Sequence, residues 1–253
     1  AIADLSITGT VEFEYSDSDS NIAANDKKAM ASANEVLIDF TNKTDSGLTI
    51  SYNMDIDGDA GGGIDDNSLT IAGGFGKLVM GQTDGASDAY SVNAQGLIAE
   101  ETDGTATGGS VLKDSSGGGN TGNADRVSFH LPAMGGLTAG VSHTDRTAAG
   151  GTDTTSYGAN YSMDAAGASI TLGYAAVQDE NSTQDIDQEN MGMKIVSGDI
   201  SLIISQGGYE ADDEDRENQG GSLSYKMPNG MTIGAFTFKS EDDLDVGEEY
   251  SAS

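Results

Sequence analysis

The chain has 253 residues with 42 acidic and 11 basic side chains, and its formal net charge is −31. This charge argues against nucleic acid as a partner, because phosphate binding requires clustered Lys and Arg. The absence of cysteine excludes disulfides and cysteine-based metal or nucleophile chemistry. No run of about 18–20 apolar residues occurs, which excludes a transmembrane helix.

The first predicted strand, residues 2–15, alternates strictly between apolar and polar side chains. Leu5, Ile7, Val11 and Phe13 share one face, while polar residues occupy the other. A strand that crosses a bilayer needs about 9–11 tilted residues, whereas globular strands typically have about five or six. The length of this segment therefore favours a membrane-crossing strand.

The same alternation continues along the chain. The apolar faces of the further strands read Val36/Ile38/Phe40, Leu48/Ile50/Tyr52/Met54, Leu69/Ile71, Leu78/Met80, Val127/Phe129/Leu131, Leu137/Ala139/Val141, Tyr157/Ala159/Tyr161/Met163, Ala168/Ile170/Leu172/Tyr174, Met191/Met193/Ile195, Ile200/Leu202/Ile204, Leu223/Tyr225/Met227 and Met231/Ile233/Ala235. The opposite faces are small or polar. About thirteen strands result, with a fourteenth beginning at 250–253, and no linker divides them into two domains.

Short and long connectors alternate between these strands. The long ones are 16–33, 55–67, 84–125, 144–155, 178–189, 209–218 and 240–249, and they hold 34 of the 42 acidic residues but only 5 of the 11 basic ones. Strands that run up and down across a membrane produce this rhythm, with tight turns on one side and larger loops on the other. One rim of the molecule is therefore expected to be strongly negative.

The apolar faces could point inward, as in a soluble sandwich, or outward, as in a lipid-facing barrel. The opposite faces are rich in Ser, Thr, Gly and Asn, which suits a water-filled interior. A soluble barrel of this many strands would enclose a large dry cavity that such small side chains could not fill. The sequence therefore predicts an all-β, transmembrane, antiparallel up-and-down β-barrel in a single domain.

Residues 73–89 read GGFGKLVMGQTDGASDA, and residues 44–49 read TDSGLT. Together with the amphipathic opening strand, these segments resemble the general bacterial porins of Gram-negative outer membranes, most closely those of alphaproteobacterial type. The resemblance implies sixteen strands, a homotrimer, contact with outer-membrane lipid and lipopolysaccharide, and a third loop folded into the lumen. It also implies that the last two to three strands of the family are absent from this sequence.

The third loop would be the connector 84–125, and two placements of it remain open. It either folds into the lumen as a constriction or lies outside the barrel. Under the first reading, one side of the constriction carries Asp84, Asp88, Glu100, Glu101 and Asp103, and the facing wall carries Lys77, Arg126 and Lys194. Facing rows of opposite charge orient dipolar solutes and disfavour apolar ones. Each of these charges could instead be a simple solvated residue.

A second group of carboxylates resembles the start of a calcium loop. It comprises Asp55, Asp57, Asp59, Asp65 and Asp66, which lie in a Gly-rich segment. Hard cations prefer several carboxylate oxygens on such a turn. However, Ala60 stands where an EF-hand needs glycine, so calcium is a possible ligand and plain solvated charge is the simpler interpretation.

Catalytic signatures are absent from the sequence. Two histidines, His130 and His143, lie in different strands without the spacing of a metal site, and no nucleophile elbow or phosphate loop occurs. We therefore expect no enzymatic activity and no required cofactor. The predicted function is an outer-membrane porin for passive diffusion of small hydrophilic solutes and ions, with a preference for cations. The alternatives are a secreted calcium-dependent adhesin or surface-layer module, and a substrate-specific channel.

Overall fold

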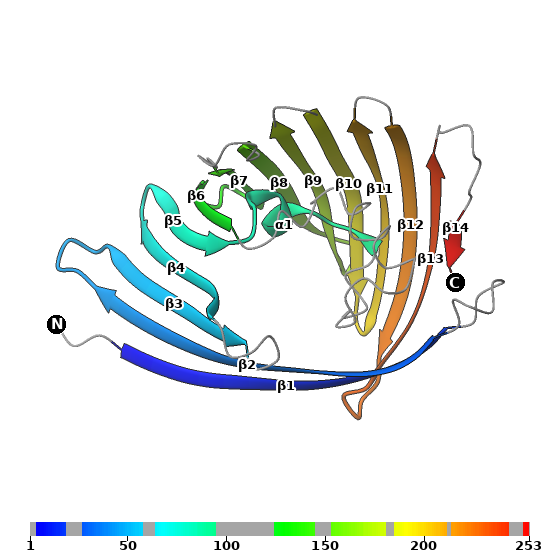
Figure 1. The fold of residues 1–253 in the computed structure, drawn as a ribbon, viewed down its shortest axis with the longest axis horizontal. Coiled ribbons are helices and arrows are strands. Elements are labelled where there is room, and N and C mark those ends of the chain that lie inside the picture. Colours follow the sequence, from blue (N-terminus) through cyan, green and yellow to red (C-terminus); the bar gives the residue numbers. More distant parts are fainter. Residues whose placement is uncertain are drawn as a thin grey trace.

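The structure is a computed structural model that describes residues 4–18, 27–57, 64–94, 124–144, 153–180, 185–211, 214–242 and 250–252. These residues form one sheet and one short helix (Figure 1). The strands are β1 (Asp4–Ser18), β2 (Lys27–Lys43), β3 (Thr49–Asp57), β4 (Ile64–Gly73), β5 (Gly76–Thr83), β6 (Ala124–His130), β7 (Leu137–Thr144), β8 (Asp153–Ala165), β9 (Ala168–Glu180), β10 (Asp185–Ser197), β11 (Ile200–Ala211), β12 (Glu214–Lys226), β13 (Thr232–Asp242) and β14 (Tyr250–Ala252), and the helix is α1 (Ala86–Tyr90).

The fourteen strands lie side by side in chain order, and each neighbouring pair is antiparallel. This confirms the predicted up-and-down arrangement. The sheet is strongly curved, and α1 lies on its concave side (Figure 1). Among the described residues, no helix has the length and apolar character needed to cross a membrane.

Tight turns gather at one end of the sheet, because every even-numbered strand up to β12 is joined to the next by a short connector. In the turn between β2 and β3, the Gly47 N–H donates to the Thr44 carbonyl at 3.0 Å, and Gly47 adopts a φ of +86° that favours glycine. The connectors that were predicted to be long join the strands at the other end. Both groups of connectors lie where the alternation predicts them.

The acidic connectors are shorter than predicted, because strand residues extend into each of them. The segments 178–189 and 209–218 are mostly strand, since β9 and β10 are paired up to Glu180 and Asp185, and β11 and β12 up to Ala211 and Glu214. Strand pairing uses the backbone N–H and C=O groups, so carboxylate side chains that reach water do not interrupt it. Charge therefore marks where the apolar zone ends and does not mark where the strands end.

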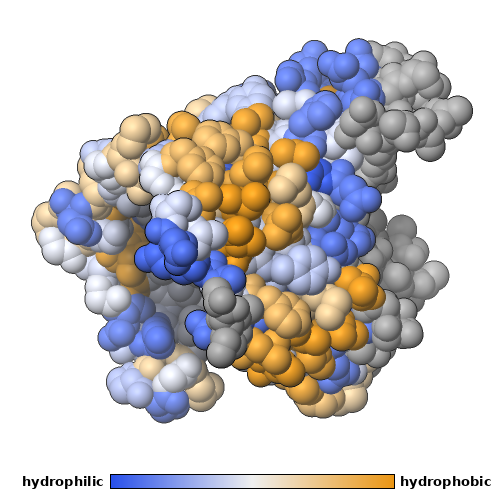
Figure 2. All heavy atoms as spheres, turned by 90° about the vertical axis from the view of Figure 1, so that its left-hand side faces the viewer, coloured by the Kyte–Doolittle hydropathy of each residue, from blue (hydrophilic) through white to orange (hydrophobic). Residues whose placement is uncertain are grey.

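The apolar faces of the strands point away from the concave side, as predicted. Leu5, Val11 and Ile204 are 57%, 62% and 46% exposed, and large apolar side chains on most other strands are exposed in the same way. These side chains form broad apolar patches next to hydrophilic regions (Figure 2). Such an outer surface requires an apolar environment, and the calcium-dependent soluble module, with its apolar faces turned inward, does not account for it.

The inner face carries many buried polar side chains together with buried apolar ones. The buried polar residues of the inner wall are Arg126, Ser128, Ser142, Thr144, Thr154, Ser156, Asn190, Asn218, Ser222 and Ser224. Among the buried apolar residues, Ala86, Tyr90, Val92 and Ala94 all follow β5 in the chain. Part of the buried core is therefore the contact between this segment and the inner wall.

Candidate functional site

Residues 85–94, called the wall segment below, cross the inner face of the sheet after β5. They begin at Gly85, form α1, and continue to Ala94. The helix contacts β6, β7, β8 and β9. Gly85 is buried between the helix and the wall, where a Cβ atom would lie 2.7 Å from Ser156 Oγ and 2.8 Å from an Nη atom of Arg126. Glycine at this position therefore lets α1 lie directly on the strands.

Serine hydroxyls on the wall bind the backbone of the wall segment. The Ala86 N–H donates to Ser142 Oγ at 2.9 Å, and the Ser87 N–H donates to Ser156 Oγ at 3.3 Å. The two hydroxyls also bond to each other at 2.7 Å. The first N–H groups of a helix have no partner within the helix, so these serines satisfy donors that would otherwise be buried unpaired.

The far end of the wall segment is held in the same way. The Ala94 N–H donates to Ser205 Oγ on β11 at 3.0 Å. The wall segment is thus bonded to β7 and β8 at its start and to β11 at its end. It crosses several strands, and the backbone bonds at both ends fix its direction.

Tyr90 anchors the middle of the wall segment. Its side chain is only 6% exposed, and its hydroxyl forms a 2.7 Å hydrogen bond with His130 Nδ1 on β6. The two rings also pack together, with centroids 5.7 Å apart. Burial raises the pKa of Tyr90 above its ordinary value, which keeps its hydroxyl protonated.

A cavity of about 390 Å³ opens between α1 and strands β5 and β6, and it is lined by side chains of both signs. Lys77, Asp84, Asp88 and His130 all contribute to its lining. Lys77 and Asp84 are exposed, whereas Asp88 and His130 are half-buried. This is the place where the structure brings predicted acidic and basic residues together.

The carboxyl group of Asp88 has a strongly raised pKa. Burial raises its pKa from 3.8 to about 7, and the nearby Asp84 carboxylate adds to the rise. The Arg126 guanidinium and a backbone hydrogen bond with Gly85 act in the opposite direction. Asp88 therefore changes charge near neutral pH.

Arg126 differs from its predicted environment. It is 4% exposed and lies beside Gly85, so it is a buried charge behind the wall segment and not a side chain on an open wall. Its sequence position on an inward face could not reveal this, because the covering residues stand at the far end of the connector between β5 and β6. Lys194 is exposed on β10, in register with Thr171 and Ile203, and does not line the cavity.

The other predicted residues are only partly described. Glu100, Glu101 and Asp103 lie outside the described residues, and so does Asp59. Asp55 and Asp57 belong to β3 and not to a loop, while Asp65 and Asp66 are described only as backbone positions of β4. In the part of the chain that the structure describes, no group of three or more His, Asp or Glu side chains could hold a metal ion.

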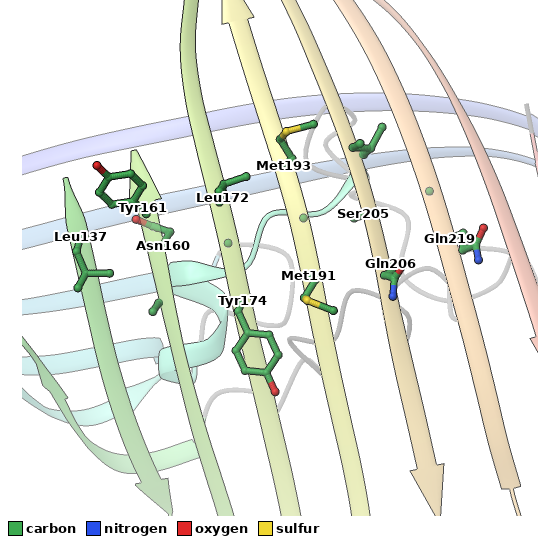
Figure 3. A pocket seen from close by; sticks show the side chains of 15 residues that line it. Leu137, Asn160, Tyr161, Leu172, Tyr174, Met191, Met193, Ser205, Gln206 and Gln219 are labelled. Carbon is green, nitrogen blue, oxygen red and sulfur yellow. The ribbon is translucent and has the colours of Figure 1, made fainter. Parts of the chain in front are cut away.

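A larger hollow, of about 710 Å³, lies over β7–β12 and has a different character. Its apolar walls include Tyr161, Leu172, Tyr174, Met191 and Met193. Figure 3 shows these side chains in front of the strands, with α1 behind the strands. This hollow therefore belongs to the outer, apolar face and is separate from the charged cavity on the inner face.

Several contacts of the site were not predicted from the sequence. They are the bond between Tyr90 and His130 and the serine anchors Ser142, Ser156 and Ser205. One available signal was the run of small residues on the inner faces of β7–β11. Small residues inside a strand often mark a place where another backbone approaches closely.

The comparisons with known proteins agree with this architecture. A family model described as Gram-negative porin matches residues 1–252. A comparison with curated protein sequences finds no match. Among solved structures, a porin refined at 1.8 Å resolution has a TM-score of 0.65 and 16% identity, with 98% of this chain and 87% of that chain covered.

Two further structures are similar in fold. The anion-selective porin from Comamonas acidovorans has a TM-score of 0.66 and 16% identity over 95% of this chain and 80% of that chain. OmpT of Vibrio cholerae, in its trimer form, has a TM-score of 0.55 and 12% identity over 100% of this chain and 95% of that chain. At these identities the likeness concerns the fold.

Proposed function

This chain belongs to the Gram-negative porin family and forms an outer-membrane channel, and we propose that small hydrophilic solutes and cations diffuse through it passively. The observation that carries the proposal is the sidedness of the sheet. Large apolar side chains are exposed on the outer face, and polar side chains line the inner face. Lipid can solvate the first surface, and water can fill the space beside the second.

The connector between β5 and β6 narrows this channel. The described part, the wall segment, lies on the inner face and supports this role for the third loop. Asp84 and Asp88 stand on the loop side, and Lys77 stands on the wall. We propose that Glu100, Glu101 and Asp103 add to the charge of the loop and Lys194 to that of the wall. Arg126 supplies a fixed positive charge behind Asp88. Opposed charges across a narrow passage orient dipolar solutes and disfavour apolar ones.

A preference for cations follows from the charge of this chain and not from its fold. A similar structure is described as an anion-selective porin, so the shared architecture permits either sign. Here the net charge is −31, and 34 of the 42 acidic residues lie in the seven long connectors predicted from the sequence. A strongly negative mouth raises the local concentration of cations.

The assembly we propose is a homotrimer in contact with outer-membrane lipid and lipopolysaccharide. The trimer form of a similar structure supports this state. The acidic connectors can bind divalent cations, calcium included, that bridge them to lipopolysaccharide phosphates. Diffusion through the channel involves no chemical reaction and requires no cofactor.

Single-channel recording in a planar bilayer under a salt gradient tests the proposal. We expect stepwise openings and a reversal potential of the sign that cation selectivity gives. Failure of the purified protein to insert, together with solubility without detergent, would contradict a porin. Conductance that saturates with one solute would instead identify a substrate-specific channel.

The charge filter has its own test. Replacing Glu100→Gln, Glu101→Gln and Asp103→Asn together should move the reversal potential toward zero, because the passage loses three negative charges. An unchanged reversal potential would show that these residues lie away from the ion path. Asp57→Asn, a single change on β3, serves as the control.

A further inference from the structure

Five glycines on the inner face of the sheet lie directly beneath the wall segment. This glycine row consists of Gly140 on β7, Gly158 on β8, Gly173 on β9, Gly192 on β10 and Gly220 on β12. On β11 the place is taken by Ser205, which binds the backbone of Ala94. At these five positions the wall segment therefore meets the strand backbone and not a side chain.

Strand register makes these residues direct neighbours except between β8 and β9, where Gly158 pairs with Ala175 and Gly173 pairs with Asn160. Gly140 pairs with Gly158, and Gly173 pairs with Gly192. Gly192 in turn pairs with Ser205, and Ser205 pairs with Gly220. The positions are far apart in the chain, yet strand pairing brings them close together beneath the wall segment.

The glycines point toward the wall segment and not toward lipid. Leu172 and Tyr174 flank Gly173 on β9, and their side chains lie in front of the strands in Figure 3, while α1 lies behind. Successive residues of a strand point to opposite faces. A side chain at Gly173 would therefore project into the space that the wall segment occupies.

The space for such a side chain is missing at every glycine of the row. A Cβ atom would lie 2.8 Å from Tyr90 Cε2 at Gly140, 2.9 Å from Tyr90 Cβ at Gly158 and 2.6 Å from Val92 Cγ2 at Gly173. At Gly220 it would lie 2.9 Å from Ala94 Cβ. At Gly192 it would collide with the carbonyl oxygen of Val92, which is backbone and cannot rotate away.

Backbone conformation does not explain these glycines. None of the five is among the glycines with positive φ, which lie mostly in turns. An alanine could adopt the same extended backbone at each position. The close approach of the wall segment is therefore the reason for glycine in the row.

We propose that the glycine row sets how far the wall segment stands from the barrel wall and so sets the free width of the channel. This inference rests on the proposed function, because it assigns the residues that position the constriction. The wall segment is bonded to Ser142 and Ser156 at one end and to Ser205 at the other. A Cβ atom at Gly192 must push the middle of the wall segment toward the lumen while both ends stay bonded.

The direct test compares Gly192→Ala and Gly220→Ala with Gly221→Ala. Gly221 neighbours Gly220 but points to the other face, where a Cβ atom would make only an ordinary contact, 3.7 Å from Thr237 Cγ2. We expect both row variants to lower single-channel conductance by about 1.5-fold or more, since conductance follows pore diameter. Gly221→Ala should leave it unchanged. Equal conductance in all three variants and the native protein would overturn the proposal.

A cysteine pair tests the position of the wall segment without relying on conductance. The chain has no native cysteine, so Ala94→Cys combined with Gly220→Cys gives a single possible disulfide. The control pair is Ala94→Cys with Gly221→Cys, whose second position faces outward. We expect mild oxidation in membranes to consume both thiols of the first pair only, as measured by thiol labelling and mass.

The outcomes separate this inference from the proposed function. If the first pair stays reduced in a protein that conducts as a channel, the wall segment is not held on the glycine row, and only the inference fails. If the native protein forms no channel, the proposed function fails, whatever the cross-link shows. If an alanine variant fails to insert, the cysteine pair still decides the position of the wall segment.

Discussion

The inner faces of β1–β3 and of β7–β12 are built from different residues, although both belong to one sheet. On β2 and β3, side chains fill the inner face, and the Asn53 amide donates to Asp39 Oδ1 at 3.0 Å across the strand pair. On β7–β12, glycine and serine occupy the positions beneath the wall segment. An inner wall that meets water can carry long polar side chains, whereas a wall that meets another backbone must be bare.

The two parts of the inner face also differ in how their charged side chains interact. Asp39 on β2 is bonded to an amide on the neighbouring strand. Asp88 lies in the wall segment and interacts electrostatically with Arg126 on β6, and burial strengthens this interaction. The variants below test whether matched changes in the two regions have unequal consequences.

The largest effect is expected for Arg126→Met, which removes the buried charge behind the wall segment. Arg126 is buried and acts electrostatically on Asp88, and removing one partner of a buried charge interaction costs at most about 3–5 kcal/mol. We expect a fall of this order in the free energy of unfolding, measured by urea titration in lipid vesicles. Lys43→Met, an exposed position on β2, should change it by less than about 0.5 kcal/mol. Similar losses in both variants would remove the distinction between the two walls.

A smaller loss is expected for Ser156→Val. Ser156 is 0% exposed and bonds both Ser142 Oγ and the Ser87 N–H, so its removal leaves a buried donor without its partner at a cost of about 1–3 kcal/mol. Hydrogen exchange at Ala86 and Ser87 should accelerate accordingly. Ser51→Val on β3 is the matched control, and exchange in α1 should not respond to it. Unchanged exchange in Ser156→Val would show that the serine anchors do not hold the helix.

The smallest effect concerns pH and Asp88. Its pKa is raised from 3.8 to about 7, so folding favours the protonated carboxyl, and this contribution to stability is complete below pH 3.8 and is lost as the pH rises through 7. In the channel, the same titration adds a negative charge between pH 6 and pH 8. Cation preference should therefore increase modestly over this interval, as measured by the reversal potential.

Asp88→Asn should abolish that change with pH, whereas Asp57→Asn on β3 should retain it. An identical pH dependence in the native protein and in Asp88→Asn would assign the titration to another group. The two variants remove one carboxylate each, so their comparison is independent of net charge.

Much of the fold follows from the period-two alternation of the sequence. That pattern predicted the order of the strands, their outward apolar faces and the long connector between β5 and β6. It succeeds because one face of each strand meets lipid, so a change of register would place polar side chains in hydrocarbon. The ends of the strands were predicted less well, because β10 and β12 continue into acidic segments that water solvates.

The site could be predicted only in part. Lys77, Asp84 and Asp88 line one cavity, and these three charges were predicted to lie on the two sides of one constriction. The burial of Arg126 and the bond between Tyr90 and His130 depend on which strands the connector crosses, and local sequence carries no record of that path. The glycine row is visible in the sequence as scattered glycines, but only the register aligns them.

The central claim is that water lies on the inner face of the sheet and lipid on the outer face. Its most direct test uses two adjacent residues of β9, Thr171 and Leu172, which point to opposite faces. Thr171→Cys and Leu172→Cys would each be inserted into lipid vesicles and treated with a membrane-impermeant thiol reagent. The account predicts rapid labelling of Thr171→Cys and little labelling of Leu172→Cys. Equal labelling of the two, or faster labelling of Leu172→Cys, would contradict it.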